Sequence, residues 1–516
     1  GVQRQAVALR HDAPFVIRET MTARGNSSQL EIPLDRVPCE KCLEEWRDPN
    51  NRRYQYPFMS CVDCGPRYTL LARLPFDRQH TSLARFPLCE ACREEYQDPS
   101  NRRFHCQTIS CPTCGPQLAF AGPNGPALAR RAIDAAVETL ATGQIIAVKA
   151  VGGYQLVCSA GDNLALQRLR DFKQRPDKPL AVMVDGIQMA KSLAVLEPAE
   201  KEALLSSPGP IVIVKKSDSY NLATEVSGAL DTVGIMLPGS PLQLALAERN
   251  VSPLVVTSAN VSGGPMIIDD VEAKRKLEEV CGGILTHDCD IQHRADDSVW
   301  QFVQGRRQIL RHGRGTSPFY GALPQKVGQD NPHFTRPTLA CGPHSNNTLA
   351  LGKGRRWLIG AHVGTLNSCE AQQSWRDALA SMCLFAGFNP KLVLTDKHPE
   401  YGSTKLGAEL GLPRQKIQHH QAHIMATVLE HNIRGTALGV AWDGSGLGEE
   451  RVIWGGEFFR LDGTDRKLVR IGSFRPFCLL GGEQAIKEPR RSAYALLSQL
   501  AEDTPDRVSV CAMDRA

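Results

Sequence analysis

Four Cys-x-x-Cys pairs, arranged as two copies of one unit, constrain this chain more than any other feature. The pairs are Cys39/Cys42, Cys61/Cys64, Cys89/Cys92 and Cys111/Cys114. The second copy follows the first at an offset of 50 residues, and the spacing within each copy is the same. Flanking residues also recur, since Asp-Pro-Asn-Asn-Arg-Arg at 48–53 returns as Asp-Pro-Ser-Asn-Arg-Arg at 98–103. This part of the chain is therefore an internal duplication.

The spacing of these cysteines predicts two structural Zn²⁺ sites. A Cys-x-x-Cys turn directs two thiolates toward one point, and two such turns complete a tetrahedral site. A closed four-thiolate site has no free coordination position, so these metals would serve folding rather than catalysis. Disulfides are the alternative, and they fit poorly because the N-terminal residues have no signal-peptide character. The spacing leaves open whether each copy closes its own site. Cys106 lies outside the pattern and is expected to be a packed thiol.

The composition predicts a multidomain globular protein of the cytoplasm. Its 516 residues correspond to roughly three or four domains. The net charge of +5 argues against a dedicated nucleic-acid coat, though not against a local basic cleft. No apolar run reaches the ~20 residues that span a bilayer. Cysteines outside the repeats have no regular partner spacing, as expected in a reducing compartment. The repeats also contain the arginine pairs Arg52-Arg53 and Arg102-Arg103. We expect these side chains to pack within the repeats rather than to contact nucleic acid.

From Ala127 onward the pattern changes to alternating helices and strands, which predicts an α/β or α+β domain with a mixed sheet. Helices are expected at 132–140 and 163–172, and strands at 144–149, 180–184, 210–214, 234–238 and 253–257. Lys149 and the run Lys173-Gln-Arg-Pro-Asp-Lys178 suit a phosphate grip, although a solvated charged face has the same composition. The loop Thr257-Ser-Ala-Asn260 suits close backbone approach to a phosphate, and an ordinary polar loop is the alternative.

A Pro-rich linker at 324–337 leads to a third domain. A strand, a glycine turn and a strand are expected at 338–351, and further strands at 392–396 and from Gly439. The last strand is expected to run into a Gly-rich turn, Asp443-Gly-Ser-Gly-Leu-Gly448. Such a turn suits phosphate or metal–nucleotide binding and is equally common in hairpins.

His419 and His423 form the strongest candidate site of the third domain. They lie four residues apart on an expected helix that runs to Glu430, which places both side chains on one face. Two imidazoles so placed can share a metal ion, with Asp443 as an oxygen ligand, and zinc and iron both suit such a donor set. A solvated histidine cluster is the alternative.

In this order the motifs resemble the HypF family of [NiFe]-hydrogenase maturation. The resemblance covers residues 36–516, and after the cysteine repeats it rests on Lys149-Ala-Val-Gly-Gly-Tyr154, Lys173-Gln-Arg175, Thr257-Ser-Ala-Asn260 and Arg294-Ala-Asp-Asp-Ser-Val299. It implies a multidomain fold: a duplicated zinc-finger domain with four cysteines per finger at 36–126, an α/β YrdC-like carbamoyl-adenylation domain with a mixed twisted sheet at 127–323, and the N-terminal part of an actin-fold, TsaD-like carbamoyltransferase domain at 338–516. Residues 1–35 would be the linker or remnant of an acylphosphatase domain.

The resemblance also implies a reaction. The YrdC-like domain would form carbamoyl-adenylate from carbamoyl phosphate and Mg²⁺/ATP and release pyrophosphate, with Lys149, Lys173 and Arg175 as catalytic groups. Further nucleotide contacts are expected at Ser258, Asn260, Arg294, Asp443 and Gly444. The third domain would transfer the carbamoyl group to the C-terminal cysteine of a HypE-like protein, with a metal ion on His419, His423 and Asp443. Single contacts are open where the chain departs from the family pattern, at Gln155, Phe172, Asn346 and Thr365.

Three other functions share parts of this sequence. Enzymes of tRNA threonylcarbamoyladenosine synthesis use related domains, but the zinc repeats and the fusion of both domains speak against that assignment. A zinc-ribbon nucleic-acid-binding protein would show steeply salt-dependent affinity, and the small net charge makes it a poor match. An O-carbamoyltransferase acting on a small metabolite shares the last two domains and is not expected to carry zinc repeats.

Overall fold

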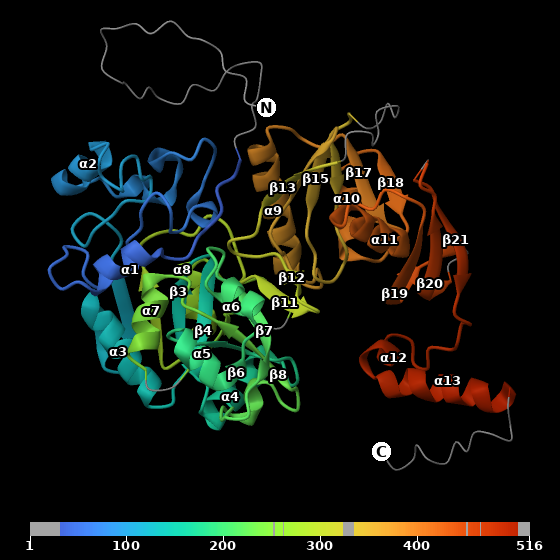
Figure 1. The fold of residues 1–516 in the computed structure, drawn as a ribbon, viewed down its shortest axis with the longest axis horizontal. Helices are drawn as coiled ribbons and strands as arrows, with labels where there is room; N and C mark the ends of the chain where they lie inside the picture. Colours follow the sequence, from blue (N-terminus) through green and yellow to red (C-terminus); the bar gives the residue numbers. More distant parts are fainter. Residues whose placement is uncertain are drawn as a thin grey trace, which may run out of the picture. The chain divides into compact units, whose positions relative to one another are not determined.

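The computed structural model describes residues 31–250, 253–261, 263–323, 335–449, 452–464 and 466–503. Most of the expected N-terminal remnant, most of the expected linker at 324–337 and the end of the third domain lie outside these residues. The chain divides into two compact units, one formed essentially by residues up to Pro318 and the other by residues from Phe319 onward (Figure 1). No helix in the described ranges is long and apolar enough to cross a bilayer.

Each cysteine repeat contains one short helix among turns. These are α1 (Glu40–Arg47) and α2 (Glu90–Gln97), and each begins directly after the first cysteine of its repeat, which is the N-cap. The first pair of cysteines in each repeat therefore lies at a helix N-terminus.

A twelve-stranded mixed sheet forms the centre of the first unit, as the alternating pattern predicted. Its strand order is β12-β11-β7-β8-β5-β9-β4-β3-β10-β1-β2, with β6 paired to β7. The strands are β1 (Leu118–Gly122), β2 (Gly125–Leu128), β3 (Ile146–Ala150), β4 (Gly153–Ser159), β5 (Ala181–Met183), β6 (Ala194–Val195), β7 (Ile211–Lys216), β8 (Thr232–Met236), β9 (Leu254–Ser258), β10 (Gly283–His287), β11 (Val299–Val303) and β12 (Arg306–Arg311).

Helices cover both faces of this sheet (Figure 1). On one face, apolar residues of four helices join the core: α4 (Asn163–Lys173), α5 (Ile187–Leu193), α6 (Pro198–Leu204) and α8 (Asp270–Leu277). On the other face lie α3 (Arg130–Ala141) and α7 (Pro241–Glu248). The first cysteine repeat packs into this second core through Cys42, Trp46 and Met59. The first repeat and the sheet therefore share one hydrophobic core.

The second unit contains two sheets. The six-stranded sheet has the order β13-β16-β15-β14-β17-β18, and a three-stranded sheet has the order β19-β20-β21. The strands are β13 (Phe319–Ala322), β14 (Thr338–Ala340), β15 (Ala350–Lys353), β16 (Arg356–Ile359), β17 (Leu392–Asp396), β18 (Arg414–Ile417), β19 (Ala437–Leu447), β20 (Ile453–Leu461) and β21 (Leu468–Ser473). The helices are α9 (Cys369–Ala386), α10 (Gly402–Glu409), α11 (His419–Glu430), α12 (Glu483–Lys487) and α13 (Pro489–Asp503).

Three expectations about this architecture need correction. The sheet of the first unit begins at Leu118 rather than after Ala127, because the β1–β2 hairpin pairs with β10. Strand β13 pairs with β16 of the second unit although it precedes the expected linker. The Gly-rich segment from Asp443 is not a turn, because β19 continues through it to Leu447 with a bulge between Trp442 and Gly446. A bulge accommodates extra residues while the strand goes on.

Candidate functional site

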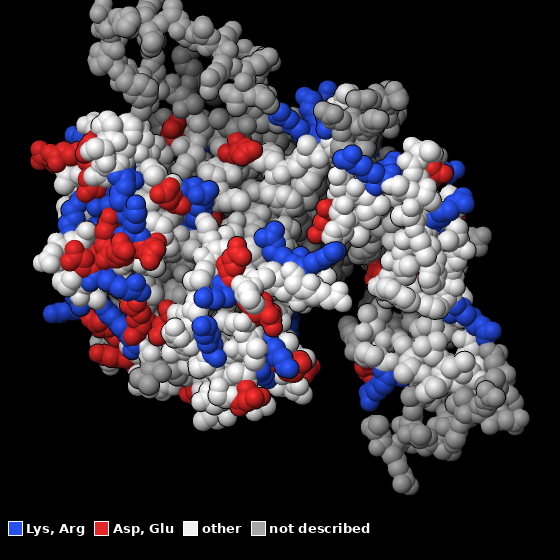
Figure 2. All heavy atoms as spheres, in the orientation of Figure 1, with Lys and Arg blue, Asp and Glu red and all other residues white. Residues whose placement is uncertain are grey.

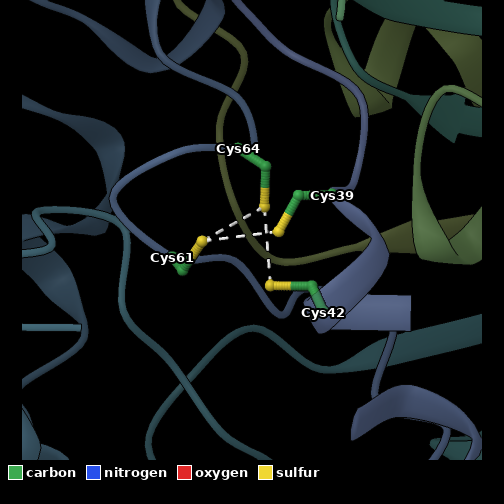
Figure 3. Close-up of side chains that lie close together, drawn as sticks. All are labelled: Cys39, Cys42, Cys61 and Cys64. Carbon is green, nitrogen blue, oxygen red and sulfur yellow. Dashed lines mark hydrogen bonds between the residues drawn. The ribbon is translucent and has the colours of Figure 1, made fainter. Parts of the chain in front are cut away.

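The four sulfur atoms of the first repeat converge on one point (Figure 3). The Sγ–Sγ distances are 3.7 Å for Cys39–Cys61, 3.8 Å for Cys61–Cys64 and 3.5 Å for Cys42–Cys64. A disulfide would place two sulfurs about 2.0 Å apart. Thiolates bound about 2.3 Å from a tetrahedral zinc ion lie about 3.8 Å from one another. The geometry therefore fits a zinc site and excludes disulfides within this cluster.

The second repeat forms its own cluster of Cys89, Cys92, Cys111 and Cys114. Its Sγ–Sγ distances are 3.7 Å for Cys89–Cys111 and 3.7 Å for Cys111–Cys114. Each copy thus closes its own site, which answers the question that the spacing left open. Cys106 is buried beside Thr108 and belongs to neither cluster, so the prediction of a packed thiol is confirmed.

Arginines of each repeat bind the cluster of the other. Arg102 of the second repeat donates to Glu45 at 2.6 Å. The same guanidinium lies 3.1–3.2 Å from three sulfur atoms of the first repeat, those of Cys39, Cys42 and Cys61. In the opposite direction, Arg52 donates to Cys92 Sγ at 3.2 Å and to Glu95 at 2.6 Å. A four-thiolate zinc site is negatively charged, so each cluster receives compensating charge from its sister repeat.

The second arginine of each pair is buried and completes the crossed arrangement. Arg53 Nε donates to the carbonyl oxygen of Ser110 at 2.8 Å, and Arg103 Nε donates to that of Ser60 at 3.0 Å. Arg53 also forms an ion pair with Glu95 at 2.7 Å. These arginines therefore hold the repeats together, as the packing interpretation predicted. On the face that Figure 2 shows, basic and acidic side chains are interspersed over the described surface of the first unit.

Positive charge gathers where helix α4 ends. Lys173 is the last residue of α4 and is buried, and Arg175 follows in the next turn. Burial, and next the charge of Arg175, lowers the pKa of Lys173 to about 7. Burial and the neighbouring Arg170 lower the pKa of Arg175 to about 10. Depressed pKa values of neighbouring cations indicate a place where an anion would be stabilised.

Lys178, the last residue of the basic run at 173–178, extends this cluster, and so does Arg311 of β12, which no sequence motif indicated. Desolvation and the charges of Arg175 and Arg311 lower the pKa of Lys178. Asp296 forms an ion pair with Arg311. Its negative charge acts in the other direction, since it raises the pKa values of Lys173, Arg175 and Lys178. The Nε atoms of Arg175 and Arg311 are buried without a hydrogen-bond partner among the described residues. Two unsatisfied guanidinium donors in a cationic cluster fit a phosphate-bearing ligand.

Lys173 connects this cluster to the loop that follows β9. Its ammonium donates to the carbonyl oxygens of Ser258 and Asn260 at 2.6 and 2.8 Å, and to Asn260 Oδ1 at 3.1 Å. Ser258 Oγ donates to the same Oδ1 at 2.7 Å. The structure thus brings together Lys173, Ser258 and Asn260, three residues selected from separate motifs. All three donors of the ammonium are engaged in holding this loop.

Lys149 and Arg294 have other partners in this structure. The buried ammonium of Lys149 pairs with Asp270 at 2.6 Å and donates to the carbonyl oxygen of His287 at 3.0 Å. Arg294 Nε donates to the carbonyl oxygen of Met266 at 2.9 Å. The nucleotide roles of Lys149 and Arg294 stay predictions. Gln155, one of the departures from the family pattern, is buried and donates to Asp297 at 2.9 Å.

Three side chains of the second unit that were expected to bind a metal ion, His419, His423 and Asp443, lie together, with donor atoms within 4.8 Å of one another. Asp443 Oδ2 lies 2.8 Å from His419 Nε2 and 3.4 Å from His423 Nε2. Hydrogen bonds to Asp396 and Asp443 raise the pKa of His419 to about 9. Two imidazoles and one carboxylate are the donors that zinc and non-haem iron take, and they leave coordination positions open. The residues present therefore fit such a metal ion.

Helix α11 approaches β19 closely enough to build this group. A Cβ atom on Gly446 would lie 2.7 Å from the ring of His420 and 3.0 Å from Cβ of His419, so the approach requires a glycine. His420 is fully buried, and its Nε2 lies 2.9 Å from the carbonyl oxygen of Gly455. The histidine between the two candidate ligands thus anchors the helix to β20. The bulge of β19, rather than the expected glycine turn, carries Asp443 and Gly444.

Four family models match the chain along its length. The model "HypF finger" matches residues 39–71 and 88–121. The model of Sua5, YciO and YrdC proteins, described as "Telomere recombination", matches 138–313. In the second unit, "HypF Kae1-like domain" matches 333–430 and "Carbamoyltransferase, Kae1-like Domain, second subdomain" matches 439–514. A carbamoyltransferase HypF of Synechocystis sp. is 42% identical over 486 residues, which is 94% of this chain. The chain belongs to the HypF family. It spans 62% of the length of that relative.

Solved structures of the HypF family have the same fold. A full-length HypF in a phosphate- and nucleotide-bound form superposes with a TM-score of 0.84 at 36% identity, covering 92% of this chain and 62% of that one. HypF of T. kodakarensis gives a TM-score of 0.85 at 34% identity, covering 91% of this chain and 61% of its own. The expected fold class is confirmed: models of zinc-finger and YrdC-like domains match, and the third domain, expected to be TsaD-like, matches Kae1-like models.

Proposed function

We propose that this chain is a carbamoyltransferase that activates a carbamoyl group with ATP and passes it to a cysteine thiolate. Membership of the HypF family supports the overall activity, because the relative described above is named a carbamoyltransferase. The observation that carries the first step is the cationic cluster at the end of α4, with its two unsatisfied guanidinium nitrogens. The substrates are ATP with Mg²⁺ and carbamate, which forms together with inorganic phosphate when water hydrolyses the oxygen–phosphorus bond of carbamoyl phosphate.

In the first step an oxygen of carbamate attacks the α-phosphorus of ATP. The bond to the β-phosphate oxygen breaks, so that carbamoyl-adenylate forms and pyrophosphate leaves. Arg175, Lys178 and Arg311 would stabilise the charge that spreads over the phosphate oxygens. Lys173 would contribute positive charge while its hydrogen bonds fix the loop at Ser258 and Asn260.

In the second step the acceptor thiolate attacks the carbamoyl carbon. The bond from that carbon to the phosphate oxygen breaks, AMP leaves, and a thiocarboxamide remains on the acceptor. We assign this step to the second unit, where His419, His423 and Asp443 would hold a metal ion that acts as a Lewis acid. The acceptor would be the C-terminal cysteine of a HypE-like protein, whose thiocarboxamide would be a precursor of the cyanide ligands of [NiFe]-hydrogenase.

Transfer to a HypE-like acceptor tests the whole proposal. With radiolabelled carbamoyl phosphate and Mg²⁺/ATP, we expect label on an acceptor that ends in cysteine and none on the same acceptor ending in serine, because a serine hydroxyl stays protonated and is the weaker nucleophile. Autoradiography of the separated proteins measures the label. A control without ATP detects direct carbamoylation by decomposing carbamoyl phosphate. Equal labelling of both acceptors, or labelling without ATP, would contradict the proposal.

A further inference from the structure

A second carboxylate lies behind the candidate metal group. Asp396 is the last residue of β17, and only 6% of its side chain is exposed. Its Oδ2 lies 2.6 Å from His419 Nδ1. Its Oδ1 accepts a hydrogen bond from the backbone N–H of His398 at 2.8 Å. Both oxygens of the Asp396 carboxylate therefore have a partner, and Asp396 meets the ring nitrogen of His419 that does not face Asp443.

The two nitrogens of the His419 ring consequently have different environments. Nδ1 meets the carboxylate of Asp396, which can only accept a hydrogen bond when ionised, so this nitrogen carries the proton. The lone pair of a neutral ring is then on Nε2, the atom that lies 2.8 Å from Asp443 Oδ2. A carboxylate behind a histidine ligand fixes the tautomer and the ring orientation, and makes the ligand more basic.

We propose that Asp396 is a positioning residue for metal binding: it holds His419 as the tautomer whose Nε2 faces the metal ion. This inference rests on the metal site of the proposed function. Asp396 is not one of the candidate metal ligands, which are His419, His423 and Asp443. Among the described contacts of the Asp396 side chain, His419 is the one member of this group that it touches, so Asp396 acts through His419.

The surroundings of Asp396 are suited to a fixed carboxylate. Strand β17 is paired on both sides, with β14 and β18. The loop after it is held by ring stacking, with ring centroids 4.2 Å apart for His398 and Tyr401 and 5.4 Å apart for Tyr401 and His344. His344 Nδ1 in turn accepts the backbone N–H of Gly402, at the start of α10, at 3.0 Å. Asp396 is therefore placed by a paired strand and a stacked loop rather than by the metal group.

Cobalt titration of three variants tests this role. The chain is first loaded with zinc at both cysteine clusters, and Co²⁺ is then added while its d–d absorption is followed. We expect Asp396→Asn to weaken Co²⁺ binding by about 10- to 100-fold, the usual effect of removing such an outer partner. Asp396→Glu keeps the carboxylate and should recover part of the affinity. Glu400→Gln, an exposed carboxylate of the same loop that pairs with Lys405, is the matched control and should bind Co²⁺ like the unmodified chain.

The outcomes separate this inference from the proposed metal site. Equal Co²⁺ affinity of Asp396→Asn and the unmodified chain, with loss of binding in Asp443→Asn, would overturn the positioning role and keep the site. No Co²⁺ binding by the zinc-loaded chain would overturn both. A merely structural role would lower the melting temperature of Asp396→Asn and leave its cobalt spectrum and affinity unchanged. The proposal requires weaker Co²⁺ binding by Asp396→Asn at a temperature at which the metal-free variant is fully folded.

Discussion

A chain carrying Cys42→Ser is expected to bind zinc at one cysteine cluster where the unmodified chain binds it at two, and to lose stability in both repeats. A serine hydroxyl does not supply the anionic ligand that the site needs. Binding of structural zinc contributes about 10–16 kcal/mol of apparent free energy to the folding of small zinc domains. Cys42 is fully buried and belongs to the core between the first repeat and the sheet. The damage should therefore extend from the metal site to the packing of the first unit.

The crossed arginines predict that the second cluster will also be affected. Arg102 and Arg103 take their carboxylate partner, Glu45, from the helix that begins at the first cluster. When that helix loosens, the second repeat loses the contacts that these arginines make. We expect the remaining zinc ion of Cys42→Ser to be released to a chelator faster than either zinc ion of the unmodified chain.

Zinc content by atomic absorption and the rate of release to a chromogenic chelator measure both effects. Cys106→Ser is the matched control, because Cys106 is equally buried but belongs to neither cluster. It should contain as much zinc as the unmodified chain. Full zinc content in Cys42→Ser, or loss of zinc in Cys106→Ser, would contradict the assignment of the clusters.

Replacing Lys173 and Arg175 together by alanine is expected to lower carbamate-dependent ATP–pyrophosphate exchange by at least about 10³-fold. Removing one preorganised group that stabilises transition-state charge typically costs about 10²–10³-fold. The double variant removes two cations of the cluster and releases the loop at Ser258 and Asn260. Zinc content should stay unchanged, because neither residue contacts the cysteine clusters.

The control for this variant is a second pair of cations in the same unit. Arg168 lies on the exposed side of α4 and Lys191 is exposed on α5, so Arg168→Ala/Lys191→Ala removes the same charge and should leave exchange within about twofold. Lys173→Met keeps more of the buried volume than alanine and covers the case in which the double variant does not fold. Exchange retained in folded Lys173→Met and in the double variant would show that the cluster is not the phosphate site.

Periodicity and spacing predicted the parts of this fold that local sequence controls. The helices at 132–140 and 163–172 and the strand at 392–396 follow from hydrophobic patterns, and the structure has them as α3, α4 and β17. The common face of His419 and His423 on α11 follows from their four-residue spacing. The β19 bulge was not predicted, because glycines after a strand are equally typical of a turn.

Contacts between distant segments were not predictable from the sequence. Arg311 joins the cluster around Lys173 and Arg175 from the edge strand β12, and no local pattern signals this. Asp396 reaches His419 across 23 residues. Lys149 was grouped with Lys173 by charge, but the structure pairs it with Asp270 of α8. In each case tertiary packing decides which charged side chains meet.

The measurement that tests the central claim most directly is ATP–pyrophosphate exchange with labelled pyrophosphate. Separate reactions contain carbamoyl phosphate, carbamate, or threonine with bicarbonate. The proposed function predicts exchange that depends on carbamate or carbamoyl phosphate and is absent with threonine and bicarbonate, because the carbamoyl group itself is adenylated. Exchange supported only by threonine and bicarbonate would contradict it and would assign the chain to the chemistry of tRNA threonylcarbamoyl modification.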